Sequence, residues 1–287
     1  MAGTHQTGGI LVLGSSGKLG RMLRALWRDG AGPGGSIHWQ YRDNPGPGGV
    51  VWRPGEAPPA GLPPIRTVLA LWGVTPGPGR DLAENRRLAL AAMELATALG
   101  ATRVLHCSSA AVYPPGPAPL SEDAAGGGIN PYGAAKLDME AALGAWAAEH
   151  PGGARACALR IANVAGADSL FGAIAGGAGE VTLDRFADGE GPWRSYIPMP
   201  ALARVLAALL TCPDAALPDA VNVALPRPLA MEALARAAGC RVAWRPAPEG
   251  AARMVALDTA RLARLVALRD ESAEQIVAGW RALEAVA

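Results

Sequence analysis

A short apolar run, Gly9–Leu13, leads directly into three glycines spaced three apart and then into a helical pattern at 18–28. Glycine at such a turn permits backbone conformations and close approaches that a Cβ would block. The first amides of the helix then point at a ligand, and the helix dipole favours negative charge there. A strand, a glycine-rich turn and a helix in this order predict a dinucleotide phosphate site. We expect it to consist of Gly14, Ser15, Ser16, Gly17, Lys18, Leu19 and Gly20. Since the chain holds 37 glycines, the spacing alone also fits an ordinary strand–helix turn.

The first half of the chain continues as strands that alternate with helices. Strands are predicted at 37–41, 50–52, 68–72, 104–107 and 157–161, and helices at 81–99 and 131–150. This alternation is typical of parallel βαβ crossovers, so the sequence predicts an α/β fold with a doubly wound, Rossmann-type parallel sheet.

The pattern weakens after residue 165. The second half predicts helices at 201–210, 229–238 and 273–285 and one short strand at 220–223. We therefore expect a dinucleotide-binding domain over 1–165, to which 198–225 returns. Residues 166–287 would mainly form a small C-terminal substrate-binding lobe.

Composition excludes several classes of protein. Half of the 287 residues are hydrophobic and 18% are charged, which excludes wholesale disorder. A net charge of +1 offers no basic field for nucleic acid, and no stretch is long and apolar enough to span a bilayer. The four cysteines form no C-x-x-C pair, so we expect neither a metal site nor a disulfide framework. A cytoplasmic protein with a small-molecule partner is predicted, and a homodimer remains open.

The end of the second strand bears on the choice of cofactor. An arginine at this point suits the 2′-phosphate of NADP, whereas an acid accepts a hydrogen bond from the 2′-hydroxyl of NAD. Arg42 falls near the expected point and favours NADP over NAD. Asp43 follows one position later, and a shift of one residue would reverse the preference. Arg42 could also be an ordinary solvated arginine.

A tyrosine and a lysine lie four residues apart where the 131–150 helix begins. Tyr132 and Lys136 share one helix face, so the phenol and the ammonium can point into one pocket. A nearby positive charge favours the phenolate. Ser109 follows the buried strand at 104–107, at the edge of the sheet where ligands of such folds bind. A lone Y-x-x-x-K is common by accident, and serines after a strand also cap turns.

Together these segments resemble an extended short-chain dehydrogenase/reductase of the NAD(P)-dependent epimerase/dehydratase family, which mostly handles nucleotide sugars. The resemblance covers about residues 9–166, and a fainter echo follows at 193–197 and 221–223. It is carried by Gly14, Gly17 and Gly20, by Asn85, and by the segments 108–113, 131–136 and 159–166.

The resemblance implies roles for individual residues. Ser109, Tyr132 and Lys136 would be catalytic, with Lys136 also binding ribose and lowering the pKa of the tyrosine. Asn85, Tyr132 and Lys136 would join the cofactor site. Ser109, Asn163 and Arg194 would contact the substrate.

The implied activity is hydride transfer at a carbinol or carbonyl carbon, by an oxidoreductase or an epimerase, on a sugar or nucleotide sugar. Trp72, Trp52-Arg53 and Pro198–Ala201 depart from the family pattern and put the nucleotide half of the substrate in doubt. The alternative is a catalytically silent NAD(P)-binding sensor.

Overall fold

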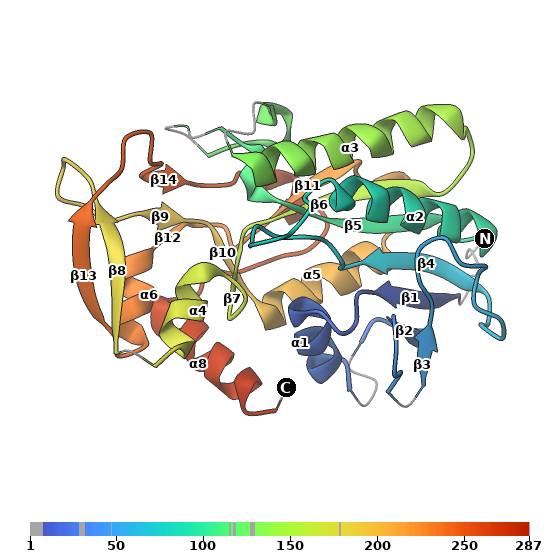
Figure 1. Cartoon of the computed structure of the whole chain (residues 1–287), viewed down its shortest axis with the longest axis horizontal. Coiled ribbons are helices and arrows are strands. Elements are labelled where there is room, and N and C mark those ends of the chain that lie inside the picture. Colours follow the sequence, from blue (N-terminus) through green and yellow to red (C-terminus); the bar gives the residue numbers. More distant parts are fainter. Residues whose placement is uncertain are drawn as a thin grey trace.

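A seven-stranded parallel sheet forms the centre of the molecule (Figure 1). The computed structural model describes residues 8–28, 32–46, 48–114, 116, 119–126, 130–177 and 179–286. The strands run in the order β11-β6-β5-β4-β1-β2-β3, and every neighbouring pair is parallel. They are β1 (Gly9–Leu13), β2 (Ile37–Tyr41), β3 (Gly49–Val51), β4 (Ile65–Ala70), β5 (Arg103–Ser109), β6 (Arg155–Ile161) and β11 (Ala220–Val223). The predicted α/β, doubly wound class is confirmed, and the strand order reverses between β1 and β4.

Helices cover both faces of this sheet. Ile10 and Val12 of β1 belong to one apolar cluster and Leu11 and Leu13 to another, because successive side chains of a strand point to opposite faces. The first cluster packs under α1 (Lys18–Leu26) and α5 (Met199–Thr211), and the second under α2 (Glu84–Ala98) and α3 (Pro131–Glu149). Both faces of the sheet are therefore covered by helices and shielded from solvent, as is usual for a parallel sheet.

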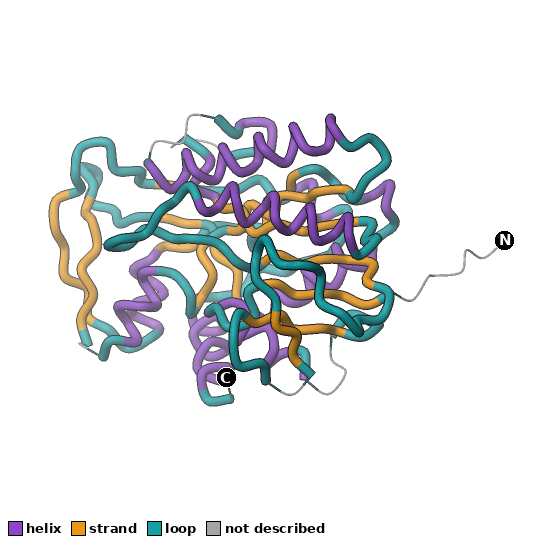
Figure 2. Tube along the Cα trace, turned by 45° about the vertical axis from the view of Figure 1, so that its right-hand side comes forward, coloured by secondary structure: helices purple, strands orange, loops and turns teal. Residues whose placement is uncertain are grey.

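The second half of the chain builds a lobe from short strands at one end of the sheet (Figure 2). Its strands are β7 (Asn163–Ala165), β8 (Glu180–Arg185), β9 (Trp193–Arg194), β10 (Tyr196–Pro198), β12 (Leu229–Ala230), β13 (Arg241–Pro246) and β14 (Met254–Val255). They pair as β7 with β10, β8 with β13, and β9 between β12 and β14. Its helices are α4 (Ser169–Ala175), α6 (Met231–Ala237), α7 (Ala260–Ala263) and α8 (Ala273–Glu284).

One glycine permits α8 to pack closely against the end of β7. Gly166 has φ +90°, and a Cβ there would lie 2.6 Å from Cδ1 of Trp280 on α8. Three single-turn 3-10 helices, η2 (Ala110–Val112), η3 (Glu122–Ala124) and η4 (Asp214–Ala216), complete the described structure. Within the described residues, no helix has both the length and the apolar character needed to cross a membrane.

Candidate active site

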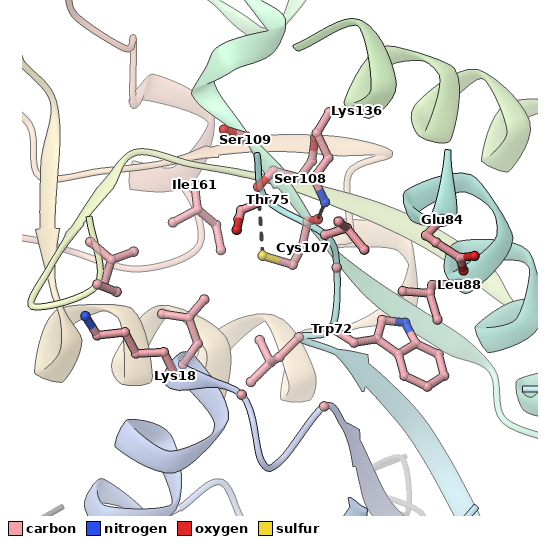
Figure 3. A pocket seen from close by; sticks show the side chains of 18 of the residues that line it. Lys18, Trp72, Thr75, Glu84, Leu88, Cys107, Ser108, Ser109, Lys136 and Ile161 are labelled. Carbon is pink, nitrogen blue, oxygen red and sulfur yellow. Dashed lines mark hydrogen bonds between the residues drawn. The ribbon is translucent and has the colours of Figure 1, made fainter. Parts of the chain in front are cut away.

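A cleft of about 1010 Å³ lies at the carboxyl ends of the central strands. Its walls come from the glycine-rich turn, the ends of β4, β5 and β6, and the start of α3. Figure 3 shows Lys18 on the α1 side, with Ser109 and Lys136 across the cleft. Of the predicted site residues, the cleft is lined by Gly14, Ser16, Gly17, Lys18, Leu19, Arg42, Ser109, Tyr132, Lys136 and Asn163.

The glycine-rich turn has the geometry of a phosphate cradle. Gly14 has φ +83°, and a Cβ there would lie 2.8 Å from the amide nitrogen of Trp72. A Cβ at Gly20 would lie 2.5 Å from the carbonyl oxygen of Gly14. The turn can therefore fold against β4 and α1 only with glycine at both positions, and α1 starts at its edge with its first amides beside the cleft. These residues fit the diphosphate of a dinucleotide.

Two residues of the turn, Ser15 and Gly20, contribute to its structure and make no contact with the cleft. The Ser15 hydroxyl is buried and donates to the Val12 carbonyl at 3.0 Å, and Gly20 lies inside the first turn of α1. Neither lines the cleft. Gln40 of β2, which the sequence did not single out, supports the turn as well. Its Oε1 accepts from the Gly14 amide at 2.9 Å, and its Nε2 donates to the Trp52 carbonyl at 2.5 Å.

The two residues after β2 that bear on the choice of cofactor, Arg42 and Asp43, differ in their access to the cleft. Arg42 is exposed and lines the cleft. Asp43 does not line it, and its carboxylate forms an ion pair with the Arg53 guanidinium. Arg53 is itself held by Glu56, whose Oε2 accepts from the Arg53 amide at 3.0 Å.

Asn85 shapes a loop at the edge of the cleft instead of lining it. Its side chain is buried; Oδ1 accepts from the Val74 amide at 3.0 Å, and Nδ2 donates to the carbonyls of Val74 at 2.9 Å and Leu82 at 3.0 Å. These bonds hold the segment 72–75, all four of whose residues line the cleft. Asn85 therefore influences the site indirectly, by fixing the backbone of this segment.

Tyr132 is positioned by the start of α3. Pro131 occupies the first turn, and the Asn130 side chain caps the helix by accepting from the Gly133 amide at 2.8 Å. Burial raises the pKa of Tyr132 to about 12, although hydrogen bonding with Ser109 partly opposes this rise. The phenol is therefore protonated at neutral pH. Lowering of this pKa by Lys136, which the resemblance implies, stays a prediction.

Lys136 lies one helical turn further along. Its Nζ donates to the Cys107 carbonyl at 2.7 Å and lies 5.8 Å from the centroid of the Tyr132 ring. Burial lowers the pKa of Lys136, while Cys107 and Glu140 act in the opposite direction. Ser109 ends β5, and its Oγ accepts from the Ala111 amide at 3.2 Å. That contact caps η2, so Ser109 combines a capping role with a place in the cleft.

The three residues expected to contact the substrate, Ser109, Asn163 and Arg194, do not all line the cleft. Asn163 lines the cleft, whereas Arg194 does not. The Arg194 guanidinium donates to three backbone carbonyls, those of Trp193 at 2.7 Å, Ala252 at 2.8 Å and Arg253 at 3.1 Å. It holds the segment before β14 against β9. Its assignment to the substrate stays a prediction.

Asp168 is a cleft residue that the sequence did not single out. It caps α4, because its Oδ1 accepts from the Phe171 amide at 2.9 Å, and its side chain also lines the cleft. Burial raises the pKa of Asp168, while the hydrogen bond from the Phe171 amide and, to a smaller extent, the charge of Lys18 oppose this rise. The only signal in the sequence is an ordinary N-cap aspartate before an apolar segment.

Behind Lys136, His106 makes folding sensitive to acid. Burial, helped by the Lys136 charge, lowers the pKa of His106 to about 3, from about 6.5 in an unfolded chain. As the pH falls, His106 therefore binds a proton in the unfolded chain before it does so in the folded chain. We expect the free energy of unfolding to be largest well above pH 6.5 and to fall as the pH drops from there toward 3, by roughly 1 kcal/mol for each pH unit.

Urea unfolding at pH 7 and pH 4.5 measures this effect. His106→Gln should be less stable at pH 7 and should lose less stability between the two pH values. The exposed His150 provides the control, since His150→Gln should keep the wild-type dependence. Equal pH dependence in the wild type and His106→Gln would contradict the assignment.

Within the described residues, no group of three or more His, Cys, Asp or Glu is arranged to hold a metal ion. The four cysteines are unpaired thiols.

Comparison with known proteins identifies the family and the fold. A model of the NAD dependent epimerase/dehydratase family matches residues 75–224, just over half of the chain. No curated protein matches the sequence.

Solved structures with the same fold are similar over nearly the whole chain. One is TunA, an NAD dependent NDP-hexosamine 5,6-dehydratase involved in tunicamycin biosynthesis, with 22% identity, coverage of 97% of this chain and 98% of that one, and a TM-score of 0.77. A second is MoeE5 in complex with UDP-glucuronic acid and NAD, with 20% identity, 96% and 100% coverage and a TM-score of 0.77. A third is the UDP-Glc/GlcNAc 4-epimerase of Campylobacter jejuni, with 17% identity, 97% and 99% coverage and a TM-score of 0.75.

Proposed function

The chain belongs to the NAD dependent epimerase/dehydratase family, and from this membership we propose that it is an NAD(P)-dependent oxidoreductase or epimerase acting at a carbinol or carbonyl carbon. The observation that carries the proposal is one cleft lined by the glycine-rich turn, Ser109, Tyr132 and Lys136. A sugar or nucleotide sugar is the proposed substrate, because TunA, MoeE5 and the Campylobacter enzyme are described with such compounds.

In this proposal the protein positions the substrate oxygen and moves its proton. A bound nicotinamide would supply or accept the hydride. Tyr132 Oη donates a proton to the carbonyl oxygen in the reduction direction and removes it from the hydroxyl in the oxidation direction. Ser109 Oγ donates a hydrogen bond to the same oxygen. Lys136 keeps a positive charge beside the phenol, which stabilises the phenolate left after proton donation.

Tyr132 holds the proton that the reduction direction uses. With a pKa of about 12, the phenol carries its proton at neutral pH and is ready to act as an acid. Reduction therefore starts from the protonation state that the protein already holds. An epimerase would need both directions in one turnover, so it would depend more strongly on the Lys136 charge.

The proposed cofactor is NADP in preference to NAD. Arg42 is exposed at the cleft, where a guanidinium can form charge-assisted hydrogen bonds with a 2′-phosphate. The Arg53 ion pair engages Asp43, the residue that would otherwise repel this phosphate. We expect NADPH to bind about tenfold more tightly than NADH, and Arg42→Ala to remove most of that difference while leaving NADH affinity nearly unchanged.

Titration of both cofactors against the wild type, Arg42→Ala and Arg53→Ala measures this preference. Arg53→Ala frees Asp43 and should shift the preference toward NADH. A wild-type preference for NADH that Arg42→Ala does not alter would remove the NADP assignment.

The proposed function is tested by ligand binding followed by turnover. Mass spectrometry of the purified protein identifies any retained dinucleotide, and a thermal-shift panel covers NAD(H), NADP(H), UDP-glucose and UDP-glucuronic acid. A ligand at 100 times its Kd adds about 2.7 kcal/mol to the free energy of unfolding, which such a panel detects. Absence of any shift by the four dinucleotides would refute the proposal. Dinucleotide binding without turnover of any carbonyl or sugar would favour the silent sensor.

A further inference from the structure

A largely buried carboxylate lies behind the candidate catalytic residues. Glu140 follows Lys136 by four residues on α3, and its side chain is 12% exposed. Its Oε1 accepts from the Ser108 hydroxyl at 2.5 Å. Its Oε2 accepts from Nη2 of Arg160 at 2.7 Å, and Nε of the same arginine lies 3.2 Å from each carboxylate oxygen.

The Arg160 side chain, 8% exposed, extends this contact across the sheet. Its Nη1 donates to the Tyr113 hydroxyl at 3.0 Å and to the Glu122 carbonyl at 2.5 Å. Tyr113 in turn donates to Oδ1 of Asn222 on β11 at 2.6 Å. One continuous network therefore joins α3 to β6, to β11 and to the segment that follows β5.

Ser108 is the point where this network reaches the cleft. Its neighbour Cys107 presents the carbonyl that accepts from Lys136, and its other neighbour is Ser109. A hydrogen bond from Ser108 to Glu140 therefore fixes both neighbours relative to α3, the helix that carries Tyr132 and Lys136. Such a bond to a charged, buried group is short and geometrically restrictive.

We propose that Glu140 is a positioning residue of the catalytic set, which fixes the end of β5, and with it Ser109, against Tyr132 and Lys136. The inference rests on the proposed function, since it assigns a task to the same three residues. Glu140 itself does not line the cleft and touches neither substrate nor cofactor in this proposal.

Glu140 also has an electrostatic effect on Lys136, which follows from the groups that surround this lysine. Tyr132 and Glu140 face Lys136 from α3, and His106 and Cys107 face it from β5. Gly73, in the loop after β4, lies beside Lys136, since a Cβ built there would lie 3.2 Å from Nζ of Lys136 and 3.0 Å from Oδ1 of Asn85 on α2. Neither Gly73 nor Asn85 titrates. Burial keeps His106 neutral and raises the pKa of the Cys107 thiol. Arg160 faces Glu140 from β6. Among the described residues, Glu140 is thus the carboxylate whose charge supports the Lys136 ammonium.

The small number of lysines makes the effect of Glu140 on the pKa of Lys136 measurable without a known substrate. Lys18 and Lys136 are the two lysines of the chain, so protein labelled with 13Cε-lysine gives two NMR signals, which Lys18→Arg assigns. In Glu140→Gln we expect the pKa of Lys136 to fall by about one unit, because a nearby opposite charge favours the ammonium and its removal disfavours it. The Lys18 titration should not move.

Asp138→Asn is the matched control on the same helix. Asp138 pairs with Arg86 at 2.9 Å, but the two side chains are 48% and 52% exposed. Its substitution should leave the Lys136 titration as in the wild type.

Ser108→Ala decides the positioning role if Glu140→Gln does not fold, since it keeps the Glu140–Arg160 ion pair. We expect a loss in kcat of about tenfold or more at an unchanged KM for the dinucleotide, because misplaced catalytic groups lower the rate of the chemical step. Ser108→Thr, which keeps the hydroxyl, should recover most of that loss. Full kcat in Ser108→Ala, or a wild-type Lys136 pKa in Glu140→Gln, would overturn the inference. Failure to bind any dinucleotide would overturn the proposed function instead, and would leave the Lys136 titration interpretable.

Discussion

Replacing Tyr132 with Phe is expected to lower kcat by about 10²–10⁴-fold while dinucleotide affinity changes little. The substitution removes only the phenolic hydroxyl, and the ring still packs beside Lys136. Without that hydroxyl, the proposed proton donor to the substrate oxygen is lost, and Ser109 would contribute only a hydrogen bond. Steady-state kinetics on the substrate found by the panel, together with a cofactor titration, measure the two effects separately.

Tyr41→Phe is the matched control for this prediction. Tyr41 is buried at the end of β2 and does not line the cleft. Its substitution should leave kcat within a factor of about two, since it removes a hydroxyl outside the reaction. If Tyr132→Phe retained more than about a tenth of the wild-type kcat, Tyr132 would not be the proton-transferring group.

Gly20→Ala is expected to damage both cofactor binding and stability. The added methyl group would lie 2.5 Å from the Gly14 carbonyl oxygen and 2.7 Å from Cα of Ser15, and both are backbone atoms that cannot swing away. The turn must therefore separate from α1, which we expect to cost about 1–3 kcal/mol of unfolding free energy, as overpacking does in other cores. The displaced amides should weaken NADPH binding by about tenfold or more, or about 1.4 kcal/mol.

Gly144→Ala makes the same chemical change where space is available. Gly144 is exposed on α3, and nothing lies within 4 Å of a Cβ built there. Because alanine is the better helix former, this variant should gain up to about 1 kcal/mol and bind NADPH like the wild type. Urea unfolding and NADPH fluorescence titration compare the two variants. Equal behaviour of Gly20→Ala and Gly144→Ala would mean that close packing at the turn is not what the site requires.

The central sheet could be predicted from sequence because its signals are local. β1 is a continuous apolar run buried on both faces, and β4 and β6 each contain a shorter apolar run, at 68–70 and 156–159. The helices α2 and α3 are long, and each is followed by a glycine or proline stop that can be seen in the sequence. The observed ends of the helices and strands differ from the predicted ones by a few residues. The helix predicted at 81–99 begins at Glu84, since the Asp81 carboxylate accepts from the Ala83 amide in a turn before it.

The strands of the C-terminal lobe could not be predicted in this way. β9, β12 and β14 contain two residues each, too few to show any period. β8 and β13 pair only with each other and expose much of their length, so their stability depends on a partner some 60 positions away in the chain.

By itself, the sequence determined the parallel sheet, the glycine-rich turn and the placement of Tyr132 and Lys136 on one helix face, because all three follow from backbone sterics and from the period of a single element. Only the tertiary structure decided which side chains are available to a ligand. It pairs Asp43 with Arg53, turns Arg194 toward three backbone carbonyls, and places Glu140 behind Ser108. Each of these outcomes depends on competition among polar groups brought together from distant segments, and the winning partner is set by distance and burial, which no local pattern encodes.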